Sequence, residues 1–167
     1  MRDRSHSVTS ADVPQSHTAA TPTGVQLDAW RKFLRAHARI TRCLEAELLA
    51  EQGLSLGAYD VLVQLVEAPE HRLRMAELAG LVLLSRSGVT RLVDRMERDG
   101  LVVRERVDED GRGVVARLTS TGFDTLRAAS STHLAGVTRH FVSALSEEEL
   151  RVVGELCGRL ADQQVDQ

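Results

Sequence analysis

The sequence predicts a mostly helical α+β protein with one short β-hairpin. Aromatic residues make up only 3% of the 167 residues, so the core must be built from Leu, Val and Ala, which favours packed helices over an all-β sandwich. Apolar residues recur at three-, four- and seven-residue steps, the spacing of amphipathic helices. Two runs rich in β-branched residues, LVVRERV and GVVARLT, flank DEDGR, which contains a tight-turn signal.

The first helix is expected to follow a polar N-terminal segment. Residues 1–26 are rich in Ser, Thr, Asp, His and Pro and hold almost no large apolar residue, so we expect a disordered tail. Helical spacing begins at Leu27 and predicts a long helix that Gly53 ends. Ser55 can cap a second helix, which stops before Pro69.

Two shorter helices are expected next, after a connecting stretch. The first runs from Met75 to about Gly80. Ser85 is a good N-cap for the second because its hydroxyl can accept a free backbone N–H. That helix runs to Asp99, and Gly100 fits the left-handed position that ends helices.

Two more helices are expected after the hairpin. The first shows a helical pattern from Phe123 and ends near Leu145. Ser146, with Glu149 three residues later, forms a capping box that opens the last helix.

Arginines gather in one part of the chain, although the net charge is −3 and the composition, with 43% hydrophobic and 27% charged residues, is that of an ordinary globular domain. Residues 85–113 hold seven of the twenty arginines. On a helical wheel of residues 85–99, one side is apolar and must face the core: Val89, Leu92, Val93 and Met96. The opposite side carries short polar and guanidinium groups: Ser87, Arg91, Arg95 and Arg98.

This arginine face can bind DNA. Arginine suits bidentate contact with guanine or phosphate, and serine and threonine reach phosphate oxygens from a helix N-terminus. A short helix, a turn, this helix and the hairpin make a winged helix-turn-helix. The alternative is a solvated face with salt bridges, because Asp94 precedes Arg98 by four residues and Arg95 precedes Asp99 by four. The position of the face opposite the core, and Arg112 at the hairpin tip, favour DNA.

The run MAELAGLVLLSRSGVTRLVDRMERDGLVVRERVDEDGRGVVARLTSTG resembles the DNA-binding lobe of MarR-type transcriptional regulators. The match is nearly letter-perfect over Ser85–Arg104, and the family's LT-x-x-G occurs at Leu118–Gly122. The resemblance implies a homodimer on a pseudo-palindromic operator of double-stranded DNA. Residues 27–54 and 119–163 would be dimerisation helices, and residues 55–118 the winged lobe.

By position, the resemblance also implies which residues meet DNA. Those in the major groove or on its phosphates would be Ser85, Arg86, Ser87, Thr90, Arg91 and Arg95, with Arg98 on the same face. Arg112 would enter the minor groove from the wing. The family's wing reads Asp-x-Arg-Asp-x-Arg; this chain matches at Asp108, Asp110 and Arg112 but lacks the first arginine, so its wing tip should differ in shape.

Family members often sense small aromatic acids in a crevice between the dimer helices and the DNA lobe. The candidates at that junction are Trp30, Arg31, His37, Tyr59 and Asp60. The spacing of Trp30 with Leu27 and Leu34 fits plain packing as well. The resemblance therefore predicts a small aromatic acid as a partner, and packing is the alternative role of Trp30.

Other functional classes find little support in the sequence. It has no phosphate-cradling glycine-rich loop, nucleophile elbow or HExxH motif, so we expect no enzyme and no cofactor. Cys43 and Cys157 are expected to be buried, inert thiols, and His133 and His140 to be packing or surface residues and not metal ligands.

We expect a cytoplasmic protein without membrane contact, because no apolar run approaches the roughly 20 residues that span a bilayer and no signal peptide is visible. The rival to DNA binding is a dimeric protein of the same fold that binds a protein partner. The arginine face argues against that rival.

Overall fold

The computed structural model describes residues 21–82, 85–107 and 113–162. The chain forms two compact units, Met1–Leu34 and Arg35–Gln167, and each is described by itself. Helix α1 (Gly24–Gln52) runs through both and begins slightly before the predicted start at Leu27. None of the described helices is long and apolar enough to cross a membrane.

The predicted helix-turn-helix is confirmed. Helix α2 (Leu56–Glu67) begins at the predicted cap, because the Ser55 side chain accepts a hydrogen bond from the backbone N–H of Ala58. Helices α3 (Met75–Leu81) and α4 (Arg86–Arg98) follow. Gly100 has φ of 72°, the left-handed conformation expected after α4.

The hairpin is also confirmed, and a third strand joins it. Strands β2 (Val102–Val107) and β3 (Gly113–Leu118) pair in antiparallel fashion. Strand β1 (Arg72–Arg74), in the stretch that we expected to be a connection, pairs with the other side of β3, which gives the order β1-β3-β2. The sheet therefore joins the start of α3 directly to the wing.

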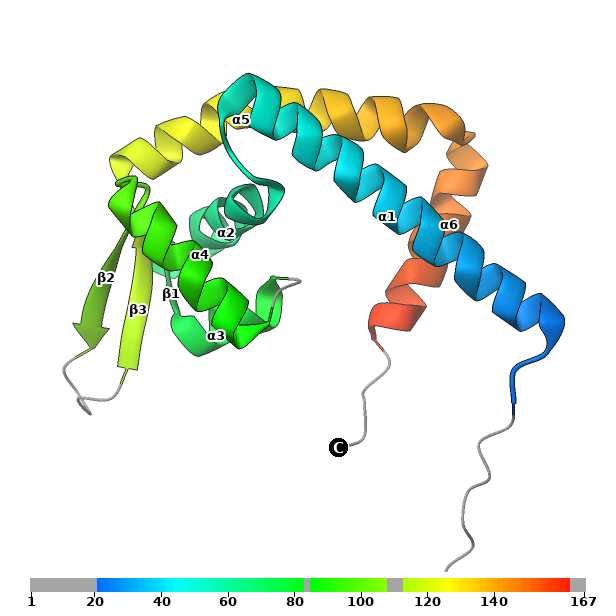
Figure 1. Ribbon diagram of the computed structural model, residues 1–167, viewed down its shortest axis with the longest axis horizontal. Coiled ribbons are helices and arrows are strands. Elements are labelled where there is room, and N and C mark those ends of the chain that lie inside the picture. The colour runs from blue at the N-terminus through cyan, green and yellow to red at the C-terminus, as the bar shows by residue number, and fades with distance from the viewer. Residues whose placement is uncertain (1–20, 83–84, 108–112, 163–167) are drawn as a thin grey trace, which may run out of the picture. The chain divides into compact units, whose positions relative to one another are not determined.

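One hydrophobic core lies among α2, α3, α4, the sheet and α5 (Ser120–His140) (Figure 1). The largest fully buried side chains come from most of these elements and from the end of α1: Leu48, Leu62, Leu65, Leu78, Met96, Val61, Val89, Val93 and Val102. The wing and the helix-turn-helix thus share a single core, which fixes α4 in place.

The start of α5 is joined closely to the turn that follows α4. The Thr119 hydroxyl donates to the carbonyl oxygen of Gly100 over 2.7 Å and accepts from the backbone N–H of Gly122 over 2.9 Å. The Thr119 N–H donates to the carbonyl oxygen of Leu101 over 3.2 Å. A Cβ on Gly122 would collide with that Leu101 oxygen, so only glycine lets the two segments approach this closely.

The C-terminal helices differ from the prediction at one boundary. Helix α5 ends at His140, before the predicted Leu145, and a short 3-10 turn (Val142–Ala144) follows. The Ser143 hydroxyl donates to the free carbonyl of Thr138 over 2.8 Å and so stabilises this end. Helix α6 (Glu147–Ala161) opens on the predicted capping box, with the Ser146 N–H donating to the Glu149 carboxylate over 2.7 Å.

Candidate nucleic-acid interface

Helix α4 presents the two faces that the wheel predicted. Its apolar side chains are buried in the core: Val89, Leu92, Val93 and Met96. Its polar and guanidinium side chains are exposed: Ser85, Arg86, Ser87, Thr90, Arg91, Arg95 and Arg98. The N-terminus of the helix is capped, because the Ser85 hydroxyl accepts a hydrogen bond from the backbone N–H of Gly88 over 3.2 Å.

The arginines on the exposed face of α4 have no acidic partner among the described residues. Within the described part of the chain, Arg86, Arg91 and Arg95 form no salt bridge. The alternative of a solvated face required two salt bridges, Asp94 with Arg98 and Arg95 with Asp99. Neither forms within the described part of the chain. The Arg98 Nε donates to the backbone carbonyl of Asp94 over 3.2 Å. The face therefore keeps cations available for an anionic partner.

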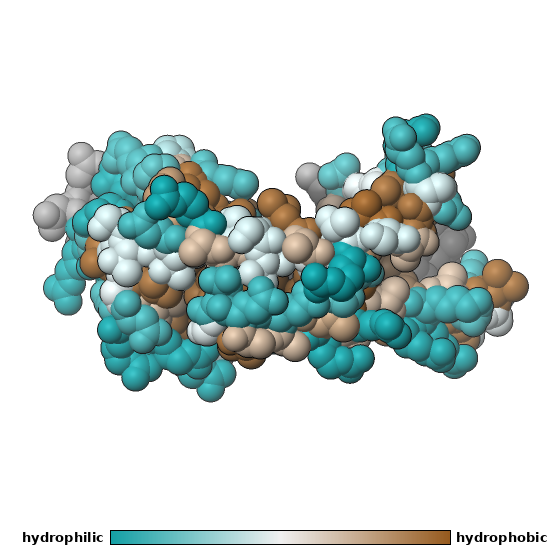
Figure 2. Space-filling model, turned by 90° about the horizontal axis from the view of Figure 1, so that it is seen from above, coloured by the Kyte–Doolittle hydropathy of each residue, from teal (hydrophilic) through white to brown (hydrophobic). Residues whose placement is uncertain are grey.

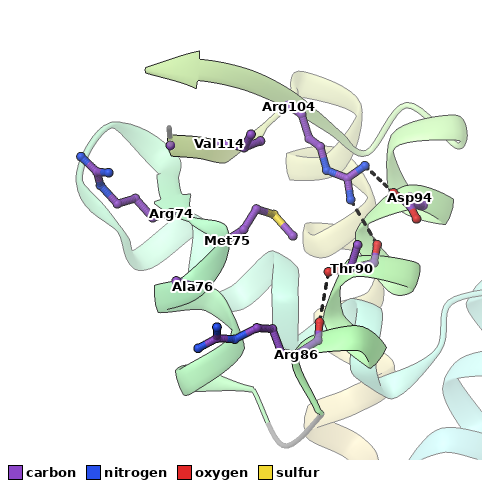
Figure 3. Close-up of a pocket in the computed structure, with 9 residues that line it drawn as sticks. Arg74, Met75, Ala76, Arg86, Thr90, Asp94, Arg104 and Val114 are labelled. Atoms are coloured by element: carbon purple, nitrogen blue, oxygen red, sulfur yellow. Dashed lines mark hydrogen bonds and ion pairs between the residues drawn. The ribbon is translucent and has the colours of Figure 1, made fainter. Parts of the chain in front are cut away.

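Asp94, the acidic residue in the middle of the arginine face, is bound by the wing. Arg104 on β2 reaches across to α4, where its Nη1 lies 2.5 Å from Asp94 Oδ1 (Figure 3). The same Nη1 lies 3.1 Å from Glu97 Oε2. Its Nη2 donates to the carbonyl oxygen of Thr90 over 3.1 Å, and its backbone N–H donates to Glu97 Oε1 over 2.9 Å. Arg104 thus ties the wing to the recognition helix and neutralises two carboxylates.

A cavity of about 580 Å³, which we call the wing cavity, lies between α4 and the wing (Figure 3). Its lining comes from the β1–α3 junction, α4 and the hairpin: Arg74, Met75, Ala76, Arg86, Thr90, Asp94, Arg104, Gly113 and Val114. Sequence reasoning missed Arg74, which lies before the motif. It found Arg104 only as a letter of the family's pattern, although that match could have indicated a structural role.

Arg112, the predicted minor-groove residue, lies outside the described residues, as do Asp108 and Asp110. The flanking register is clear, since Val107 pairs with Gly113 at the end of the β2–β3 ladder. The structure thus describes the base of the wing.

A second cavity, of about 470 Å³, brings together two of the predicted sensor residues. This α1–α2 cavity is lined by His37 and Asp60, together with Thr41, Arg42, Glu45, Leu56, Gly57 and Val82. Burial raises the pKa of Asp60 above its usual 3.8, and the Glu45 carboxylate raises it further, while His133 partly offsets both. Arg42 is a cation that the sequence did not single out.

The other predicted sensor residues are not among the lining residues of this cavity. Tyr59 is buried and stacks on the ring of His133, with ring centroids 4.3 Å apart. Burial lowers the pKa of His133 below its usual 6.5, and its buried Nδ1 has no hydrogen-bond partner among the residues described. Trp30 and Arg31 belong to the first unit, where Trp30 stacks on Phe33 with centroids 6.1 Å apart.

The predictions for the cysteines and histidines have mixed outcomes. Cys157 is exposed and Cys43 is partly exposed, so the expectation of two buried thiols is wrong for this chain. The reason for Cys157 is that α6 buries none of its residues within the single chain. His140 binds a carboxylate, with its Nε2 2.7 Å from Glu47 Oε1, and His133 packs on Tyr59, so the two histidines have separate partners.

A helix-turn-helix with a β-wing and an arginine face that has no acidic partner among the described residues defines a winged-helix DNA-binding protein. Comparison with known proteins then shows that the chain belongs to the MarR family of transcriptional regulators. A model of the MarR family matches residues 52–113. The transcriptional repressor YetL of Bacillus subtilis is 31% identical over 115 residues, which cover 67% of this chain and 69% of YetL.

Two solved structures from Streptomyces coelicolor are similar over most of the chain. Sco3205, a MarR family regulator crystallised in complex with DNA, matches with a TM-score of 0.81 and 31% identity over 89% of this chain and 94% of its own. AbsC, of the same family, matches with a TM-score of 0.79 and 34% identity over 89% of this chain and 100% of its own. The protein is therefore a DNA-binding transcriptional regulator and not an enzyme.

Proposed function

We propose that the protein is a ligand-responsive repressor that binds a pseudo-palindromic operator as a homodimer. The observation that carries the proposal is the exposed face of α4, where Arg86, Arg91 and Arg95 have no acidic partner among the described residues. The relative YetL is a repressor, which supports repression as the mode of regulation, and the Sco3205 complex supports DNA as the partner. Such a protein acts in the bacterial cytoplasm, where the chromosome lies.

Different residues of α4 are proposed to contact bases and phosphates at the major groove. We assign Arg91 and Arg95 to base edges, because guanidinium groups bind guanine O6 and N7 in bidentate fashion. Ser85, Arg86, Ser87 and Thr90, from the first turns, are assigned to phosphates, as expected of a helix N-terminus. Arg98 contacts the DNA backbone, and Arg112 enters the minor groove from the wing.

A second copy of the chain would cover the exposed apolar residues of the C-terminal helices. Helix α6 buries none of its residues in the single chain, and Val152, Leu156 and Leu160 are between 47% and 59% exposed. Leu134 on α5 is 62% exposed, and Figure 2 shows apolar side chains reaching the surface among hydrophilic ones. Soluble proteins cover apolar surface of this kind in an interface. Residues 27–54 and 119–163 are thus proposed to form the dimer.

The proposal predicts a two-fold symmetric footprint on the DNA upstream of the protein's own gene. Two heads would protect half-sites about one DNA turn apart. The variant Arg95→Ala is expected to weaken operator binding by about 1–3 kcal/mol, because a bidentate base contact is lost. Its control is Arg127→Ala on α5, whose exposed salt bridge joins it to Asp124 of the same helix and is worth little. Operator affinity unchanged by Arg95→Ala would refute the assignment of α4.

The proposed effector is a small aromatic acid in the α1–α2 cavity. Its carboxylate would bind a cation of α1, and the cavity offers Arg42 beside the predicted His37. Arg31 and Trp30, also on α1, stay candidates. By linkage, an acid that lowers DNA affinity tenfold must bind the DNA complex about 1.4 kcal/mol more weakly than it binds the free protein.

Titration with salicylate-like acids is expected to quench Trp30 emission and to release operator DNA over the same concentration range. Arg42→Gln should weaken both effects about tenfold or more, because it removes a charge-assisted hydrogen bond. Arg39→Gln, an exposed arginine of α1 outside the cavity lining, is the matched control. If no acid changes both signals, the protein is a regulator without such an effector.

A further inference from the structure

The wing cavity lies where a DNA backbone must pass. One wall is α4, through Arg86, Thr90 and Asp94, and the opposite wall is the hairpin, through Arg104 and Val114 (Figure 3). With α4 in the major groove and the wing in the adjacent minor groove, the phosphate strand that separates the two grooves crosses between them. This argument rests on the docking of α4 given under the proposed function.

The arginines that line the wing cavity are not equivalent. Arg104 is engaged by Asp94 and Glu97. Arg74 and Arg86 form no salt bridge within the described ranges, and the only carboxylate of the lining, Asp94, already binds Arg104. Two guanidinium groups without an acidic partner among the described residues thus lie at the rim of the cavity, where Figure 3 shows them extending from two different elements and away from each other. Met75 and Val114 are apolar residues of the same lining.

We propose that Arg74 binds a backbone phosphate of the strand that passes the wing cavity, next to the phosphate assigned to Arg86, which makes Arg74 a DNA contact outside the recognition helix and the wing. Arg74 is held for this role by its backbone. Its N–H donates to the Glu77 carboxylate over 3.0 Å at the start of α3, and its residue pairs with Val115 of β3. Its guanidinium forms no salt bridge with a described residue, so it can bind a phosphate while these backbone contacts stay in place.

Arg72 is the natural control for Arg74. It lies two residues earlier on the same short strand, but its Nη2 binds Glu70 Oε2 over 2.5 Å and it is absent from the lining of the wing cavity. The two arginines thus share a strand and a charge and differ in whether the charge is already neutralised. Only Arg74 should contribute to DNA affinity.

The first test is the salt dependence of binding by the full-length protein to the protected upstream duplex and to a scrambled duplex. One lost phosphate contact lowers the slope of log K against log salt by about one, which corresponds to about tenfold weaker binding at 0.1 M salt. Arg74→Gln should show this loss on both duplexes, Arg74→Lys should restore most of it, and Arg72→Gln should show none. An unchanged slope for Arg74→Gln, or an equal loss for Arg72→Gln, would overturn the proposal.

The second test locates the phosphate. The duplexes of a series each carry one neutral methylphosphonate in place of a phosphate. At one position, between the major-groove and minor-groove contacts, the wild type should bind the modified duplex more weakly than the unmodified one. At that position Arg74→Gln should bind both duplexes equally. If Arg74→Gln stays sensitive at every position, Arg74 holds no phosphate there. Arg95→Ala separates this result from the proposed docking, because it should reduce discrimination between the two duplexes by about 5- to 150-fold, which corresponds to about 1–3 kcal/mol, whereas Arg74→Gln should preserve it. Normal circular dichroism and melting of Arg74→Gln would show that the fold is intact.

Discussion

Arg104→Gln is expected to weaken operator binding by about tenfold or more and to destabilise the fold by about 1–3 kcal/mol. The side chain of Arg104 is only 22% exposed, and its guanidinium binds two carboxylates and a backbone carbonyl of α4. Its loss removes hydrogen bonds to charged groups, each worth more than a neutral one. It also frees Asp94 in the middle of the arginine face, where an unpaired carboxylate repels phosphate, and it releases the wing from α4.

Arg117→Gln provides the control for Arg104. Arg117 on β3 binds Glu105 on β2 over 2.6 Å, a salt bridge inside the hairpin that does not reach α4, and both side chains are more than a third exposed. Such a pair contributes little to stability. Binding isotherms measured at equal folded fraction should separate the two variants. Adding Asp94→Asn to Arg104→Gln should recover part of the affinity. If Arg104→Gln bound the operator with wild-type affinity, the contact of Arg104 with α4 would not be needed for DNA binding.

The largest loss of stability is expected from Gly122→Ala. A methyl group there would collide with the backbone carbonyl oxygen of Leu101 and lie 2.8 Å from Leu118 Cδ1. The backbone atom cannot move without separating α5 from the turn after α4. Overpacking typically costs 1–3 kcal/mol, and a collision with backbone should reach about 3 kcal/mol or more.

Urea unfolding of Gly122→Ala should therefore show a much lower midpoint, or too little folded protein to measure. Gly80→Ala is the control, because Gly80 lies in α3 of the same lobe and an added Cβ meets nothing within 4 Å. Alanine in a helix is worth about 0.5–1 kcal/mol over glycine, so this variant should be at least as stable as the wild type. Equal midpoints for Gly122→Ala and the wild type would contradict the close approach.

Local signals explain why most elements could be predicted. The caps at Ser55, Ser85 and Ser146 and the left-handed Gly100 act within a few residues of themselves, so the sequence alone reveals them. Strand β1 could not be found in this way. It has one apolar residue, Leu73, and it exists because it pairs with Ala116, which is distant in sequence.

The candidate site follows the same rule. Periodicity placed Arg91 and Arg95 opposite the core, because one helix sets both positions. Helical spacing offered Arg98 as a partner of Asp94 only under the alternative of a solvated face, and the structure instead brings Arg104 to Asp94 from a strand. The roles of Arg74 and Arg42 depend on cavities built by several elements, and no pattern in the sequence displays those.

The joint of Thr119 and Gly122 with the turn at Gly100 and Leu101 has a mechanical consequence. Helix α5 is packed against the turn that directly follows α4. The 13-residue α4, about 20 Å long, should therefore move with α5 as one rigid element. A rotation of α5 by about 10° would displace the N-terminal end of α4 by about 3 Å. The N-terminal end of α4 carries Arg86 and Ser87, so a small rotation of the proposed dimerisation helix α5 would move these proposed DNA contacts by about the length of a hydrogen bond.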